Sequence, residues 1–142
     1  MANTKHLDVL DSAQCLELLR TVRVGRLVFL EDSAPTVHPV NFRLHEDRVI
    51  IRVADGTKLR AALANEVVAF QADELDPDLR SGWSVTVVGH ARLIRDIDEL
   101  VAVAGTFVQP WAEGQRNHFI RVRGDRITGR RLLDTAPARP GG

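Results

Sequence analysis

Short segments of β-forming residues separated by tight-turn signals dominate the sequence, and they constrain the fold more than any other feature. In the first half, turn signals at residues 32–35 and 45–47 separate such segments. Between these turns Val40, Phe42 and Leu44 alternate with polar residues, as in a strand with one buried face. Strands joined by tight turns run antiparallel, so the sheet is expected to be mainly antiparallel. A barrel is favoured, because closing such a sheet removes its edges.

Further segments of the same kind follow at residues 67–72, 83–94, 119–122 and 127–133. The segment 83–94 is long, and Gly89 in its interior indicates a bulge or a close approach of another backbone. The pattern predicts six or seven strands in all, and no internal repeat is visible.

Three short helices are predicted beside the strands. Asp11 and Gln14 have the spacing of a capping box and begin a helix that ends near residue 21, before Gly25. Thr57 is a good N-cap for a second helix, and Asp96 begins a third that reaches about residue 107. The fold class is therefore mainly β (α+β), with one domain over residues 1–133 and a disordered tail at 134–142.

Composition excludes several classes of protein. Lys and Arg number 19 and so do Asp and Glu, with no basic tract, so nothing favours a nucleic-acid partner. The single cysteine, Cys15, lies on an apolar helical stripe and cannot form an intrachain disulfide. Residues 1–11 lack an apolar signal core, and no segment is long enough to span a membrane. A soluble, cytoplasmic protein is expected.

The first candidate site lies where a strand leads into a glycine-containing loop and then a helix. A helix N-terminus offers unpaired N–H groups and a positive dipole, which suit a phosphate. Thr57 adds a hydroxyl, Lys58 adds a charge, and Arg52 can contribute a forked donor from the strand. The spacing is not that of a Walker loop. The alternative is a capped helix with solvated cations.

The second candidate is the segment His38-Pro39-Val40-Asn41. Proline in a strand is confined to an edge or a bulge, so pairing should loosen at Pro39 and leave backbone groups to face a planar ring. Asn41 could donate to or accept from that ring. The alternative is an edge strand with a surface histidine.

Tryptophan marks a third candidate, because the chain has only two. Trp83, followed by Ser84, and Trp111 lie beside predicted loops, where the ring could cover a ligand or enter a partner subunit. Ordinary packing is the alternative. The five histidines show no metal-ligand spacing, so no metal site is predicted, and no catalytic nucleophile is recognised.

The order of these motifs resembles that of the pyridoxamine 5′-phosphate oxidase-like proteins, in particular their small actinobacterial flavin-binding branch. The 5-nitroimidazole resistance proteins are more distant relatives. The resemblance covers about residues 7–133 and is carried by the segments Val24-Gly25-Arg26-Leu27, His38-Pro39-Val40-Asn41, Gly56-Thr57-Lys58, Gly82-Trp83-Ser84-Val85 and Ile127-Thr128-Gly129-Arg130.

The resemblance implies a six-stranded split β-barrel that forms a homodimer, with flavin mononucleotide (FMN) sites at the subunit interface. It implies that the phosphate is held by Arg52, Thr57 and Lys58. It also implies that the ring system lies near His38, Pro39, Val40 and Asn41, and near Trp83, Ser84 and Trp111. The function implied is a flavin-dependent oxidoreductase without a catalytic side chain.

Several alternatives stay open. The substrate-phosphate motif of true pyridoxamine phosphate oxidases is missing from the segment that begins at Gly129, so oxidation of vitamin B6 is not implied. The deazaflavin F420 could replace FMN in a reductase, and FAD is a further alternative. A non-catalytic flavin-binding or haem-binding protein is another, with His38 or His118 as the first candidates for a haem ligand.

Overall fold

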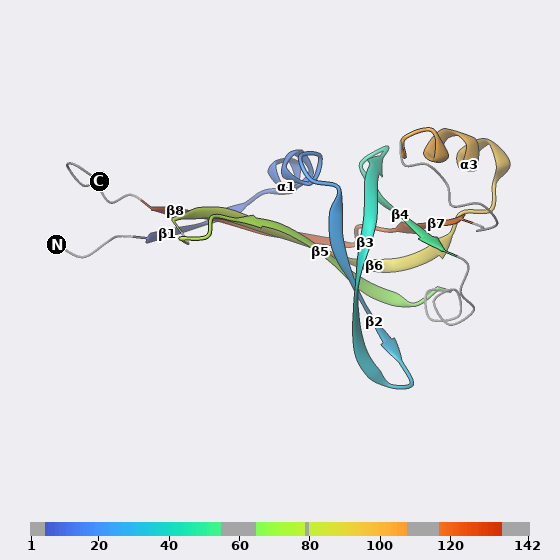
Figure 1. Cartoon of the computed structure of the whole chain (residues 1–142), viewed down its shortest axis with the longest axis horizontal. Helices are drawn as coiled ribbons and strands as arrows, with labels where there is room; N and C mark the ends of the chain where they lie inside the picture. Colours follow the sequence, from blue (N-terminus) through green and yellow to red (C-terminus); the bar gives the residue numbers. More distant parts are fainter. Residues whose placement is uncertain (1–4, 55–64, 79, 108–116, 135–142) are drawn as a thin grey trace.

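The computed structural model describes residues 5–54, 65–78, 80–107 and 117–134, and it is dominated by strands (Figure 1). The predicted second helix, at Thr57, lies outside the described residues, and so does the predicted disordered tail except for Asp134, which is the last residue of a strand. The described elements are β1 (Lys5–Leu10), α1 (Ser12–Leu19), β2 (Val24–Glu31), β3 (Ala34–His45), β4 (Arg48–Ala54), β5 (Val67–Leu75), β6 (Ser81–Leu93), α3 (Ile97–Ala104), β7 (Asn117–Val122) and β8 (Arg126–Asp134).

The strands form one antiparallel sheet that closes on itself. Their order is β1-β8-β6-β5-β2-β3-β4-β7, and an additional pairing of Ala91–Leu93 with Val122–Ile120 joins β6 to β7. Of the eight strands, β1 and β8 lie outside the ring, so the closed barrel has six strands. The predicted six-stranded antiparallel barrel is therefore confirmed.

Strand β1 was not predicted. Its sequence KHLDVL places Leu7 and Val9 two residues apart, which is the strand period, but both side chains are exposed. The strand is held by its antiparallel ladder with β8, from Lys5 opposite Asp134 to Leu10 opposite Gly129. Long-range pairing, which is not visible in the segment itself, decides its structure.

Two parts of the sheet extend away from the barrel (Figure 1). One is an arm built from β1, β8 and the adjoining ends of β5 and β6. The other is the end of the β2–β3 hairpin, because β2 pairs with β5 only over Arg26–Val28 whereas its ladder with β3 runs as far as Glu31. Asp32 and Ser33 at its tip both have positive φ, 50° and 66°, as a two-residue hairpin turn of type I′ requires.

Side chains on alternate residues of the six strands fill the barrel. Phe42 and Phe70 lie at its centre with their ring centroids 4.6 Å apart. Gly25 belongs to β2 and does not act as a break before it, which corrects the prediction. A Cβ at Gly25 would come within 2.4 Å of the Phe70 ring, so glycine is required there by packing.

Gly89 lies where another part of the backbone crosses β6. A Cβ added at this residue would lie 1.4 Å from the carbonyl oxygen of Arg123, in the turn between β7 and β8. The close approach predicted from the sequence is therefore confirmed. Gly89 allows β6 to pass directly beneath this turn.

The two described helices begin where the sequence predicts. Asp11 and Gln14 form the capping box of α1, with the Gln14 amide N–H donating to the Asp11 carboxylate at 2.8 Å. Helix α1 buries Cys15, and this burial, followed by the nearby charge of Asp11, raises the pKa of the thiol. Neither helix is long and apolar enough to cross a membrane.

Helix α3 covers one side of the barrel. Asp96 caps its first turn, and its buried side packs on β4 and β7 in a second apolar cluster. That cluster consists of Ile50, Ile94, Val103, Phe107 and Phe119. The helix thereby brings Phe107, just beyond its C-terminus, against the outside of the barrel wall.

Candidate functional site

The strand period divides the predicted site residues between two faces of the sheet. We call the face turned away from the barrel core the outer face. On β3, Val40 is buried in the barrel and His38 shares its side, with its ring edge-on to Phe29 at 5.2 Å. Pro39 and Asn41 lie on the outer face. The four consecutive residues therefore cannot all present side chains to one ligand.

Asn41 and Arg52 are brought together on the outer face. They are directly paired residues of β3 and β4, and they form the last pair of that ladder. Among the described strands, β3 continues beyond them beside β2 only, whereas Val53 and Ala54 of β4 pair with β7. The two strands therefore part at Asn41 and Arg52. Thr57 and Lys58 follow β4 in sequence but lie outside the described residues.

The edge of β3 that borders this opening is rich in proline. The amide N–H of Phe42 donates to the carbonyl of Arg23 on the β2 side, at 3.0 Å. Because this direction alternates along a strand, the backbone groups of Pro35, Val37 and Pro39 point to the opposite edge. The expectation that pairing loosens at Pro39 is confirmed for that edge alone, since the ladder with β2 is unbroken there.

Arg43 and Phe107 complete the surroundings of Arg52, and the sequence analysis missed both. The guanidinium carbons of Arg43 and Arg52 lie 5.2 Å and 5.5 Å from the centroid of the Phe107 ring. Arg43 Nε donates to the carbonyl of Thr106 at 3.3 Å. Partial burial, followed by the charges of Arg23 and Arg52, lowers the pKa of the Arg43 guanidinium. Positive charge is therefore concentrated beside the opening.

Trp83 and Ser84 lie on opposite faces of β6. Trp83 is only 8 % exposed and belongs to the barrel core, because β6 buries every second residue from Trp83 to Ala91. The sequence places Trp83 beside a loop, but its side chain occupies a periodic core position of β6. The Trp83 side chain also lines a pocket of about 380 Å³ at the end of the arm, with Glu74 and Arg131. Trp111 lies outside the described residues.

Ser84 belongs to a polar cluster on the outer face. The Gln71 amide lies 2.7 Å from an Asp73 oxygen and 3.3 Å from the Ser84 hydroxyl. Arg26 forms an ion pair with Asp73 at 3.1 Å. The β2–β5 register, continued by two residues, places Asp73 level with Val24, which is paired with Asn41. Ser84 and Arg52 therefore lie in one row across five strands of the outer face.

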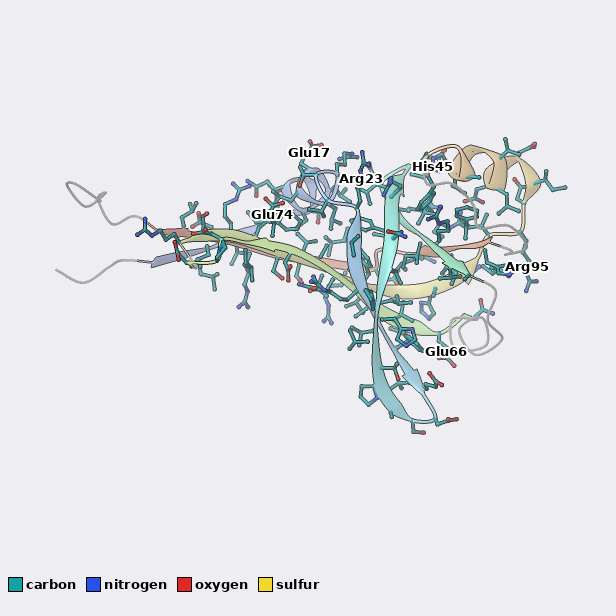
Figure 2. All side chains as sticks on the ribbon, in the orientation of Figure 1. Glu17, Arg23, His45, Glu66, Glu74 and Arg95 are labelled. Atoms are coloured by element: carbon teal, nitrogen blue, oxygen red, sulfur yellow. The ribbon has the colours of Figure 1, made fainter. Side chains whose placement is uncertain are left out.

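Exposed apolar side chains surround this polar cluster. Most of the large exposed hydrophobic residues lie on the outer face, as the ladders show: Leu7, Val9, Val24, Leu30, Val37, Val67 and Leu75. We refer to these seven residues as the apolar set. Figure 2 shows how the arm, which carries Glu74, and the end of the molecule near Arg95 lie on either side of the β2–β3 hairpin.

The sequence of this chain matches that of a known family over most of its length. The family described as pyridoxamine 5′-phosphate oxidase matches residues 11–131, which is most of the chain. The chain belongs to this family. Its barrel, with the parting of β3 and β4 and the extra β1–β8 ladder, is thus the fold of a known family, as the sequence motifs had indicated.

Individual relatives agree with this assignment. The FAD-binding protein from Mycobacterium smegmatis is 38 % identical, with a TM-score of 0.76 over 87 % of this chain and 98 % of that one. A conserved protein of unknown function from Corynebacterium diphtheriae is 31 % identical, with a TM-score of 0.75 over 89 % of this chain and 98 % of that one. An uncharacterised protein from Mycobacterium tuberculosis is 35 % identical over 87 % of this chain and 84 % of its own length.

Proposed function

We propose that this protein is a flavin nucleotide-binding oxidoreductase whose ligand phosphate is held by Arg52, Thr57 and Lys58. The observation that carries the proposal is the pairing of Arg52 with Asn41 at the point where β3 and β4 part. A guanidinium there presents several N–H donors beside an opening in the sheet, which suits a phosphate.

The described residues fit the ring system of a flavin as well as its phosphate. Asn41 offers both a donor and an acceptor, and the neighbouring edge of β3 offers the backbone carbonyls of Val37 and Pro39. The bound flavin would supply the transfer of a hydride or of single electrons. The protein would bind the flavin, orient it and shield it from water, and no side chain is required as a nucleophile.

The identity of the flavin is a separate part of the proposal. We expect FMN, because Arg52, Thr57 and Lys58 match the positions that hold the FMN phosphate in the family that the sequence resembles. FAD gains support from the FAD-binding protein of Mycobacterium smegmatis. F420 and a non-catalytic haem-binding role remain the alternatives, and an axial ligand from His38 would give a Soret band that disappears in His38→Ala.

We also propose that the protein is a homodimer formed through its outer face. The apolar set lies on this one face, and a concentration of exposed apolar side chains on one face commonly marks a site of protein association. The polar cluster around Asp73 would lie within the interface and contribute charge complementarity. Ser84 and Trp111 would then reach a flavin near the boundary of two subunits.

Spectroscopy and titration test the flavin proposal. The purified protein is expected to bind FMN or FAD, with a shifted visible absorption band and altered flavin fluorescence. Arg52→Met should weaken FMN binding about 10- to 100-fold, because a hydrogen bond to a charged group is lost, and should leave riboflavin binding unchanged. Arg48→Met, on the same strand, is the matched control. If wild-type protein binds no flavin, the proposal is wrong.

A further inference from the structure

Two arginines share one aromatic ring beside the proposed phosphate site. Arg43 and Arg52 lie on adjacent strands, and both guanidinium carbons are within 5.5 Å of the centroid of Phe107. Phe107 is itself fixed, because it is 5 % exposed and its ring packs against Phe119 at 5.3 Å. The ring is therefore a rigid support that holds two positive charges close together.

Arg43 differs from the other arginine that flanks Ile50. Arg43 and Arg121 are the residues paired with Ile50 on its two sides. Arg121 forms an ion pair with Glu99 of α3. Within the described part of the chain Arg43 has no such carboxylate, and its hydrogen bonds go to the carbonyls of Phe42 and Thr106. One charge on this surface is thus neutralised and the other is not.

A structural role accounts for only some of the N–H donors of the Arg43 guanidinium. Its bond to Thr106 satisfies a carbonyl just after the C-terminus of α3, where a cation also interacts well with the helix dipole. That bond uses Nε, and the bond to Phe42 uses one N–H of NH1. A guanidinium has five N–H donors, so donors remain for a ligand.

From this arrangement we propose that Arg43 and Arg52, held side by side by Phe107, form a two-arginine subsite for the phosphate of the bound ligand. The inference rests on the proposed function and adds Arg43 as a binding residue and Phe107 as a positioning residue. The charge of Arg52 is one cause of the lowered pKa of Arg43, so the two guanidiniums repel one another. A phosphate carries up to two negative charges and several acceptors, so it offsets this repulsion and engages both guanidiniums.

The test uses Arg43→Gln in the full chain, with Arg48→Gln as the matched control. Glutamine keeps an N–H donor for the Thr106 carbonyl but removes the charge. Calorimetric titration with FMN, riboflavin and inorganic pyrophosphate is compared for the three proteins. We expect Arg43→Gln to lose about tenfold in affinity for FMN and pyrophosphate, to bind riboflavin as the wild type does, and to keep its melting temperature.

The outcomes separate this inference from the proposed function. If wild-type protein binds no flavin but binds pyrophosphate, and Arg43→Gln weakens that binding, the two-arginine subsite stands and the flavin proposal fails. If Arg43→Gln weakens only the binding of pyrophosphate to protein already loaded with FMN, the subsite stands and serves a second phosphorylated ligand. Unchanged affinity of Arg43→Gln for both FMN and pyrophosphate, or no pyrophosphate binding by the wild type together with unchanged FMN binding, overturns the inference.

Phe107 provides an independent arm of the test. Phe107→Leu keeps an apolar side chain but removes the aromatic face, so phosphate affinity should fall several-fold. Phe107→Tyr keeps the aromatic face, so its phosphate affinity should equal that of the wild type. Val103→Ala, in the same apolar cluster but without an arginine contact, should lower stability and leave phosphate affinity unchanged. If Phe107→Leu and Val103→Ala behave alike, Phe107 has no positioning role.

Discussion

Gly89→Ala is expected to destabilise the protein by about 3 kcal/mol or more, because no space exists for a methyl group at this position. The new Cβ would lie 1.4 Å from the Arg123 carbonyl oxygen, which belongs to backbone and cannot rotate away. Either β6 or the turn before β8 must move, and this movement disturbs the β6–β7 ladder that closes the barrel. Thermal unfolding followed by circular dichroism should show a melting temperature lower by about 6–12 °C.

Gly105→Ala is the matched control for this substitution. Gly105 follows α3 with a helical φ of −65°, and the nearest atom to an added Cβ is 3.6 Å away. Alanine fits there and lowers the conformational entropy of the unfolded chain. The free energy of unfolding should therefore rise by roughly 0.4–1 kcal/mol. Equal melting temperatures for the two variants would show that the crossing of β6 and the Arg123 turn is not as close as described.

Val24→Asp is expected to convert the proposed homodimer into a monomer. Val24 is 53 % exposed in the single chain, and it lies level with Asp73 in the middle of the outer face. In an interface the new carboxylate would be buried without a partner and next to an existing negative charge. An uncompensated buried charge costs about 3–5 kcal/mol. The dissociation constant of the dimer should therefore rise by roughly two to three orders of magnitude.

Sedimentation velocity over a range of micromolar concentrations measures this effect. Val101→Asp is the control, because Val101 is equally apolar and 70 % exposed but lies on the exposed side of α3 and not on a strand of the sheet. Flavin binding should weaken with the dimer in Val24→Asp and persist in Val101→Asp. A wild-type protein that sediments as a monomer while it binds flavin would contradict the interface proposal.

The barrel could be predicted from the sequence because local signals and long-range pairing agree in most of it. The alternation at Val40, Phe42 and Leu44, the turn at residues 32–35 and the capping box at Asp11 each determine a local conformation that the final fold keeps. Strand β1 has an equally good alternation, but the segment is a strand because it pairs with β8 at the other end of the chain. Pairing partners cannot be identified from one segment alone.

The site could be predicted only in part, for a related reason. Asn41 and Arg52 belong to consecutive strands, so hairpin geometry alone brings them together. Arg43 meets Phe107 only because α3 packs across β4 and β7, and no local pattern indicates that contact. Trp83 was interpreted as a residue beside a loop, although the alternation of Val85 and Val87 already places its side chain on the buried face of the strand. The Arg43 contact depends on tertiary packing, whereas the position of Trp83 follows from the strand period.

The prolines on β3 have a consequence for how the protein behaves at high concentration. An uncovered strand normally recruits strands of other molecules, and such recruitment leads to fibrils and precipitation. Between residues 34 and 40 the side of β3 that no described strand pairs with has Pro35 and Pro39 where amide hydrogens would otherwise project, so Val37 is left as its single donor. A neighbouring chain cannot form a ladder on that side, yet a small molecule that carries its own N–H groups still finds carbonyl oxygens there.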